Sequence, residues 1–222
     1  MRLHHASEAQ AAFIKACRRG DDATLAAVLA LEGELAVDVH AGCEDGFQRA
    51  CEGGHVGCMA QLLALTGPRH VDVHALGERA FRWACSHGHL SAVDVLLGLD
   101  GDRTVDVNAR GAWALWVACR FGHLPVAQRL LALDDGRAVD VHAHGEGALR
   151  GATDKKQGAI LRLLLAGTGR HAPDPAVVRE LGLEGARAGA VWAGAGLRGG
   201  RGVPVASRVS RRAAARAARA GK

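Results

Sequence analysis

The chain has 222 residues, 49% of them hydrophobic and 23% charged, which is typical of a soluble globular protein with enough apolar material for a sizeable core. The first five residues do not lead into the apolar segment of a signal peptide. No apolar stretch approaches the roughly 20 residues that span a bilayer. We therefore expect an intracellular protein, cytoplasmic or nuclear, that is neither secreted nor transmembrane.

Several sequence markers recur with a period of 34 residues. Val-Asp-Val starts at Val37, Val71, Val105 and Val139. The same spacing separates Cys17, Cys51, Cys85 and Cys119, as well as the Gly-His pairs at Gly54, Gly88 and Gly122 and the leucine pairs at Leu62, Leu96, Leu130 and Leu164. Independent markers with one period indicate an internal repeat.

The repeat predicts five units over residues 10–170, with approximate bounds 10–36, 37–70, 71–104, 105–138 and 139–170. Phe13, Ala16 and Cys17 identify the first unit because they match the positions of later units. In the fifth, Asp154-Lys155-Lys156-Gln157 replaces the usual segment around Gly-His, which indicates a capping repeat with a polar outer face.

Each unit is expected to form two short helices. In the third unit, Phe81, Ala84 and Cys85 lie at i, i+3 and i+4, the spacing of one helix face. Gly88 then suits a left-handed C-terminal cap, and a second helix carries an apolar face that includes Leu96 and Leu97. Pro125 falls in the first turn of such a second helix, where proline is tolerated. Helix pairs this short bury their apolar faces only by stacking on neighbours.

The third unit resembles an ankyrin repeat. Ala84-Cys85-x-x-Gly88-His89-Leu90, then Val93, Leu96-Leu97 and Val107-Asn108-Ala109, match that family's pattern. The usual Thr-Pro-Leu-His is replaced, for example by Arg79-Ala80-Phe81-Arg82, which is similar to variant ankyrin units with Ala-Leu-Arg-Trp-Ala. The resemblance implies an all-α, ankyrin-type α-solenoid of five helix-pair repeats that acts as a non-catalytic protein–protein interaction scaffold or adaptor.

Neither the histidines nor the cysteines form a pattern that favours catalysis or metal binding. His55, His89 and His123 occupy a slot that holds Asp21 in the first unit, so we interpret them as helix caps. His40, His74 and His142 share a slot with Asn108, which indicates hydrogen bonding. The periodic cysteines and Cys58 occupy predicted core positions, whereas Cys43 lies outside them. With no catalytic or phosphate-binding motif, we expect no enzyme, cofactor, metal or small-molecule substrate.

The ankyrin resemblance also implies where a partner protein binds. The family uses the two positions before Gly-His and the tips of the fingers, the loops that precede each first helix. At the helix positions this chain has Arg18, Arg19, Glu52, Ser86, His87, Arg120, Phe121, Asp154 and Lys155, and its finger candidates include Glu44, Glu78, Arg79, Ala112, Trp113 and Glu146. These slots vary between units, as a binding face requires. The alternative interpretation is that they are merely solvated.

Trp113 and Phe121 are the strongest candidates for partner anchors, because buried aromatic side chains often dominate interface energy. Trp83 shares an inner slot with Val117 and is expected in the core, whereas Trp116 suits either role.

The period is lost from residue 171, and residues 171–222 contain ten Lys or Arg and three acidic residues, a net charge of +7. This Ala-, Gly- and Arg-rich tail is expected to be disordered, with helical potential at residues 212–219. It is a candidate nuclear-import signal or contact for nucleic acid or anionic membrane. The alternatives are a dispensable tail or an artefact of gene prediction.

Overall fold

A computed structural model describes residues 2–134 and 136–185, and every regular element within them is helical. The α helices are α1 (Arg2–Arg19), α2 (Asp22–Leu29), α3 (Ala41–Glu52), α4 (Val56–Leu63), α5 (Ala75–Ser86), α6 (Leu90–Leu97), α7 (Ala109–Phe121), α8 (Leu124–Leu131), α9 (Ala143–Asp154), α10 (Gly158–Leu165) and α11 (Pro175–Glu180). Short 3₁₀ turns, η1 (Gly33–Leu35), η2 (Gly67–Arg69), η3 (Gly101–Arg103) and η4 (Gly169–His171), follow the second helices. The all-α prediction is confirmed for this part of the chain.

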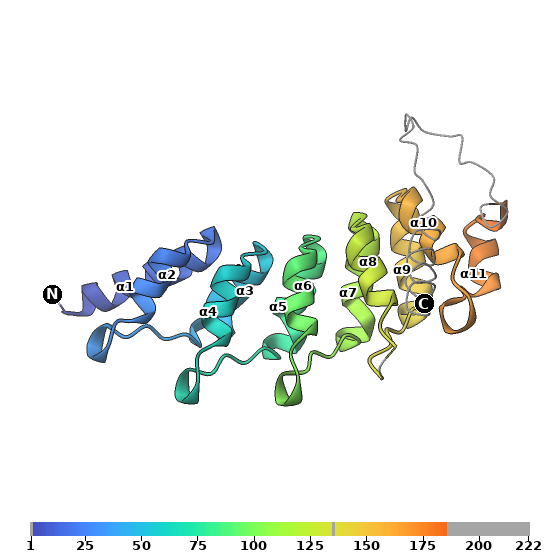
Figure 1. The fold of residues 1–222 in the computed structure, drawn as a ribbon. Helices are drawn as coiled ribbons and strands as arrows, with labels where there is room; N and C mark the ends of the chain where they lie inside the picture. Colours follow the sequence, from blue (N-terminus) through green and yellow to red (C-terminus); the bar gives the residue numbers. More distant parts are fainter. Residues whose placement is uncertain (1, 135, 186–222) are drawn as a thin grey trace, which may run out of the picture. The chain divides into compact units, whose positions relative to one another are not determined.

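Successive helix pairs lie side by side in chain order (Figure 1). The first helices of the pairs, α1, α3, α5, α7 and α9, each pack against the next one along the chain. The second helices α2, α4, α6, α8 and α10 form a parallel series, and each also packs against its own first helix. The described units are therefore two layers of helices joined by regularly spaced loops.

Most apolar positions predicted from the period are buried, whereas Leu63, Leu90 and Leu131 are half-buried against the core. One slot of the first helices holds Phe13, Phe47, Phe81, Leu115 and Leu149, each no more than 1% exposed. In the second helix of the third unit, Leu96 and Leu97 are at most 2% exposed. Burying each such side chain contributes about 1.5–3 kcal/mol, so stability is distributed along the stack.

Each finger ends in a left-handed turn that the sequence did not predict. In α5, Leu76, Gly77 and Glu78 have φ values of +56°, +65° and +60°, so the right-handed helix begins only after Glu78. Arg82 holds this turn by donating from Nε to the Gly77 carbonyl oxygen at 2.9 Å and from Nη2 to that of Leu76 at 3.1 Å. The corresponding residues of α3, α7 and α9 have the same backbone conformation.

Two independent features of the structure require a glycine between the two helices of a unit. Gly88 has φ +74°, which confirms the predicted left-handed conformation, and the His123 ring of the next unit lies directly over it. A Cβ atom at Gly88 would be 2.4 Å from His123 Nδ1. Gly54 has the same relationship with His89. Both the backbone angle and the neighbouring ring therefore exclude a side chain here.

The interpretation of His55, His89 and His123 as helix caps is wrong. Each stands at the N-cap position, but none makes a side-chain cap hydrogen bond. His123 Nε2 instead hydrogen-bonds the carbonyl oxygen of Ser86 in the preceding unit at 2.8 Å, and His55 Nε2 bonds that of Arg18 at 3.1 Å. The histidines of this slot therefore join units, whereas Asp21, in the same slot of the first unit, does cap its helix by accepting the Thr24 N–H.

A second set of hydrogen bonds joins the fingers. His74 Nδ1 lies 2.6 Å from Glu78 Oε1, and His74 Nε2 lies 2.7 Å from the Asp102 carbonyl oxygen in η3 of the same unit. Glu78 Oε1 also accepts the backbone N–H of Asp106 at 3.2 Å. His40 with Glu44 and His142 with Glu146 repeat this arrangement, which confirms the hydrogen-bonding role expected for the histidine slot. We call the set the finger braces.

Arginines in the loops that follow the second helices make a third connection. Arg103 Nη1 donates to the Leu63 carbonyl oxygen at 3.0 Å, and Arg69 and Arg137 do the same to Leu29 and Leu97. Each accepting carbonyl belongs to the last residue of the preceding unit's second helix, where a cation is favourably placed.

The predicted boundary at residue 170 is too early. Asp174 lies 34 residues after Asp140, and its backbone N–H donates to Glu146 Oε1 at 2.9 Å, as Asp106 does to Glu78. Leu183, 34 residues after Leu149, is 2% exposed. The frame therefore continues to residue 185. The sequence does not show this continuation plainly, because Pro173-Asp174-Pro175 stands where the earlier units have Val-Asp-Val.

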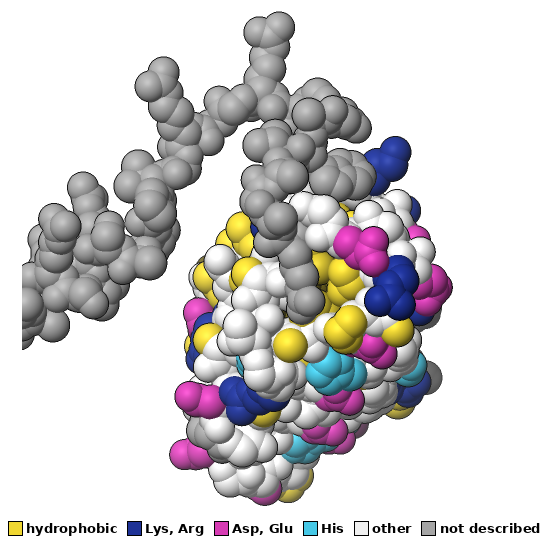
Figure 2. All heavy atoms as spheres, turned by 90° about the vertical axis from the view of Figure 1, so that its right-hand side faces the viewer, with side chains coloured by type: hydrophobic (Ala, Val, Ile, Leu, Met, Phe, Trp, Pro, Cys, Tyr) yellow, Lys and Arg dark blue, Asp and Glu magenta, His cyan; other side chains and the backbone are white. Residues whose placement is uncertain are grey.

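The fifth unit is consequently not the last element of the stack. Gln157 occupies the histidine slot and donates from Nε2 to the Arg120 carbonyl oxygen at 3.3 Å, so this unit keeps the standard connection. Viewed from the end that carries α11, hydrophobic side chains reach the surface among charged ones (Figure 2). The expected disorder of the tail, and its helical potential at residues 212–219, concern residues 186–222, which lie outside the described part of the chain.

Candidate partner-binding surface

The predicted helix-end positions lie at the C-terminal ends of the first helices and in the residues just after them. Phe121 is the most prominent, because its side chain is 51% exposed. Its ring centroid lies 6.4 Å from that of His123, so one flank of the ring faces the inter-unit histidine. The other exposed positions are Arg18, Arg19, His87, Asp154 and Lys155, and the half-buried ones are Glu52, Ser86 and Arg120. Arg120 Nη1 is 3.4 Å from Asp154 Oδ2, so these two candidates pair with each other.

The finger glutamates are not surface residues, which corrects their assignment as partner contacts. Glu44, Glu78 and Glu146 are 3%, 3% and 4% exposed, and their carboxylates belong to the finger braces. Ala112, in the same slot, is 2% exposed. The left-handed turn directs this slot inward, so Glu78 cannot contact a partner without breaking its bonds to His74 and Asp106.

Trp83, Trp113 and Trp116, which lie in the described part of the chain, are half-buried and covered by arginines. Arg79 Cζ lies 4.4 Å from the Trp83 ring centroid, and Arg49 Cζ lies 5.5 Å from it. The expectation that Trp83 belongs to the core is therefore wrong, because its side chain is half-buried at the surface. Its slot is buried where it holds the smaller Val117 and Gly151.

Trp113 is also less accessible than the sequence suggested. Its ring packs against the hydrophobic core, lies 5.9 Å from the Trp116 centroid and is covered by Arg82 Cζ at 4.9 Å. Arg120 Cζ stands 5.4 Å from the Trp116 ring. Arginine over a tryptophan face is favourable by about 0.5–1 kcal/mol at exposed sites. Trp113 thus supports the guanidinium of Arg82.

The structure brings together three arginines that the sequence did not connect. The Arg110 side chain lies over Gly77, where a Cβ atom would be 3.2 Å from Arg110 Nε, and Arg82 donates to the Gly77 carbonyl oxygen. Burial lowers the pKa of Arg82, and the positive charges of Arg110 and Arg79 lower it further. Of these three, only Arg79 was a candidate. The pairing of Arg82 with Arg110 joins two units and has no local sequence signal.

The cysteines provide no nucleophile in the described core. Cys17, Cys51, Cys58, Cys85 and Cys119 are buried, and burial raises the pKa of each thiol, to about 12 for Cys17, Cys58 and Cys119. Their predicted core positions are confirmed. Cys43 is exposed in its left-handed turn. The histidines likewise form no metal cluster, since no group of three or more His, Cys, Asp or Glu with suitable geometry occurs among residues 2–134 and 136–185.

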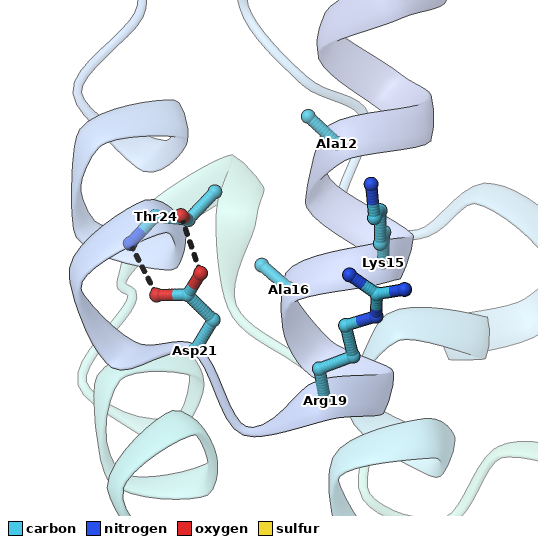
Figure 3. A pocket seen from close by; sticks show the side chains of 6 residues that line it. All are labelled: Ala12, Lys15, Ala16, Arg19, Asp21 and Thr24. Carbon is cyan, nitrogen blue, oxygen red and sulfur yellow. Dashed lines mark hydrogen bonds between the residues drawn. The ribbon is translucent and has the colours of Figure 1, made fainter.

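A small hollow of about 190 Å³ lies between α1 and α2 (Figure 3). Two of its polar groups already serve the fold, because Asp21 Oδ1 accepts the Thr24 backbone N–H at 3.0 Å and Oδ2 accepts the Thr24 hydroxyl at 2.6 Å. Lys15 and Arg19 line the other side from α1. The hollow is open, and this arrangement is a helix cap beside two surface cations.

No protein-family model matches the chain, and a search of curated proteins gives no match. Among the helices of the described part, none combines the length and the apolar character needed to cross a membrane.

Proposed function

We propose that the chain is an ankyrin-type repeat protein, a solenoid that acts as a non-catalytic scaffold or adaptor by binding another protein along its first helices and fingers. The observation that carries this proposal is the contrast between a constant frame and a variable face. The slot of Phe47 and Phe81 is buried in every unit. The slot just before the inter-helix turn instead holds Arg19, Gly53, His87, Phe121 and Lys155.

This contrast supports partner recognition for a physical reason. Stacking of the units requires only the buried slots and the inter-unit hydrogen bonds, so it leaves the helix-end slot free to differ. Because a phenylalanine in that slot is exposed, the accessible part of its apolar surface does not contribute to packing of the stack. Phe121 is one of three large hydrophobic residues in the described chain that are exposed, the others being Leu35 at 39% and Leu76 at 41%.

The test is capture of a partner by full-length protein carrying Phe121→Ala. Leu35→Ala is the matched control, because it removes a similar exposed apolar side chain far along the sequence in η1. We expect wild type and Leu35→Ala to retain the same partner and Phe121→Ala to lose it, since an anchor residue contributes roughly 2 kcal/mol or more. Retention of that partner by all three proteins would remove the helix-end slot from consideration.

A second candidate function rests on the charge of the remaining chain. Residues 186–222 contain nine Lys or Arg and no Asp or Glu, which favours association with nucleic acid or an anionic membrane, or recognition as a nuclear-import signal. Neutralising Arg208, Arg211 and Arg212 with glutamine separates the two candidates. A tail-dependent interaction would be lost in this variant and would weaken steeply with salt, whereas an interaction at Phe121 would persist.

A further inference from the structure

We propose that Arg79, Arg82 and Arg110 form a binding site for an acidic polypeptide segment, which the partner contributes to the fingers of the third and fourth units. This inference rests on the proposed function, because it names the chemistry of the partner. We call these three residues the arginine cluster.

The arginine cluster is held in place before any partner arrives. Arg79 lies 4.4 Å from the Trp83 ring centroid, and Arg82 lies 4.9 Å from that of Trp113. Two hydrogen bonds from Arg82 to the left-handed turn fix its guanidinium further. Side chains that are already ordered lose less conformational entropy when they bind a ligand.

The charge of the arginine cluster is not compensated locally. Within the described residues no ion pair joins Arg79, Arg82 or Arg110 to a carboxylate, although Arg49, Arg120, Arg129, Arg150 and Arg179 all have one. The nearest acid in sequence is Glu78, but its carboxylate is 3% exposed and is bound by His74 and the Asp106 N–H. Other titratable neighbours are His144, whose Nε2 bonds the Arg110 carbonyl oxygen at 3.2 Å, and Arg49, which lies over the Trp83 ring with Arg79. The carboxylates of Asp45 and Glu52 are paired with Arg49.

The three positive charges of the arginine cluster therefore repel one another, and a bound anion would reduce this repulsion. Burial and the charges of Arg110 and Arg79 lower the pKa of Arg82, which agrees with a cluster that lacks a counter-ion. A guanidinium fork pairs with a carboxylate through two parallel hydrogen bonds. Leu76, 41% exposed, belongs to the same turn and offers an apolar contact beside the charges.

The surroundings favour an acidic peptide over a nucleic acid. A longer polyanion would also meet the exposed carboxylates of Asp72 and Asp106 in the neighbouring fingers, and these would repel its phosphates. A short segment with a few acidic residues around an apolar one can match the arginine cluster and Leu76 alone. The basic residues 186–222 of this chain have the wrong sign to occupy it.

The test uses full-length protein and a fluorescent pentapeptide of four glutamates around a central leucine, with the glutamine analogue as its control. The variant Arg79→Gln with Arg110→Gln removes two charges of the arginine cluster but leaves Arg82, which holds the turn. Arg129→Gln with Arg162→Gln is the matched control, because it removes two arginine charges from the second helices α8 and α10, outside all candidate binding positions. The tail is identical in all proteins, so its contribution cancels.

We expect the glutamate peptide to bind wild type and the Arg129/Arg162 variant equally and to lose at least about tenfold in affinity on the Arg79/Arg110 variant, as for loss of two charged hydrogen bonds. The proposal is overturned if glutamate and glutamine peptides bind alike, or if the two double variants behave alike. It is also overturned if a 12-nucleotide oligothymidylate displaces the peptide and shows the same loss on Arg79/Arg110. None of these outcomes affects capture through Phe121, so the proposed function is tested separately.

Discussion

His74 and Glu78 are joined by a 2.6 Å contact in which the histidine is half-exposed and the glutamate is buried. Both ring nitrogens of His74 face acceptors, the Glu78 carboxylate and the Asp102 carbonyl oxygen, so the protonated ring donates to both. In the fourth unit both partners are replaced together, by Asn108 and Ala112. Asn108 alone accepts from the Asp140 N–H at 2.8 Å and donates to the Ala138 carbonyl oxygen at 2.9 Å. The chain thus joins its fingers in two ways, by a histidine–glutamate pair in one unit and by a single asparagine in another.

From this equivalence we predict that replacing His74 alone destabilises the protein, whereas replacing His74 and Glu78 together does not. His74→Ala leaves the buried Glu78 carboxylate without its donor, and we expect a loss of about 1–3 kcal/mol in the free energy of unfolding. The double variant His74→Asn with Glu78→Ala recreates the pair found at Asn108 and Ala112 and should recover most of that loss. Urea denaturation of both variants measures the difference. If the double variant is less stable than His74→Ala, the equivalence is incorrect.

The finger braces also predict a pH dependence of stability. The hydrogen bond to Glu78 raises the pKa of His74, and the Asp102 carbonyl raises it further. Glu44 and Glu146 likewise raise the pKa values of His40 and His142. A raised histidine pKa contributes stability that is complete below the unfolded value of about 6.5 and is lost as the pH rises through the folded value.

The measurement is the difference in unfolding free energy between wild type and the His74→Asn, Glu78→Ala variant as a function of pH. We expect wild type to lose stability relative to the variant as the pH rises from 6 to 9. The comparison is needed because burial lowers the pKa of His89, which favours stability in the opposite direction. A difference that does not vary with pH would show that His74 does not bind its proton more tightly in the folded state.

Gly88 is predicted to tolerate no side chain, for two separable reasons. Gly88→Ala adds the cost of φ +74° and a contact of 2.4 Å with the His123 ring. Gly101→Ala adds only the backbone cost, because Gly101 has φ +61° and nothing within 4 Å of the new Cβ. We expect Gly101→Ala to cost about 1 kcal/mol and Gly88→Ala distinctly more. Equal shifts in thermal melting temperature would mean that the ring moves aside freely.

The accessible thiol is predicted to be Cys43. In native protein a thiol reagent at pH 8 should modify Cys43 rapidly and the five buried cysteines slowly, because burial raises their pKa values and blocks access. All six should react in denaturant. Cys43→Ser should abolish the rapid phase, and a rapid phase that persists in this variant would show that one of the buried slots opens.

Leu183 is predicted to be part of the stack although it lies beyond the regular sequence period. It is 2% exposed in the slot of Leu149, so Leu183→Ala should destabilise the protein by about 2–4 kcal/mol. Leu35→Ala, at a 39% exposed leucine, is the control and should have little effect. Similar small changes in both would indicate that the frame ends before residue 173.

The sequence alone was sufficient to predict the helix pairs, their period and the core. Phe81, Cys85, Leu96 and Leu97 recur at helical spacing, and burial of such positions is required by the hydrophobic effect whatever the details of the fingers. The left-handed conformation of Gly88 was also predictable, because few other residues adopt it at so little cost. These features are local or periodic, and a sequence displays both.

Only the tertiary structure decided which polar residues are buried and which meet. Glu78 looks like a surface residue in the sequence, yet a left-handed turn directs it toward His74 and the backbone of the next unit. Arg82 reaches Trp113, and Arg110 reaches Gly77, across more than 30 residues of chain. Contacts of this kind depend on how one unit is rotated and placed on the next. Hydrophobic periodicity determines that the units stack. The geometry of the side chains between two units determines which polar groups contact each other.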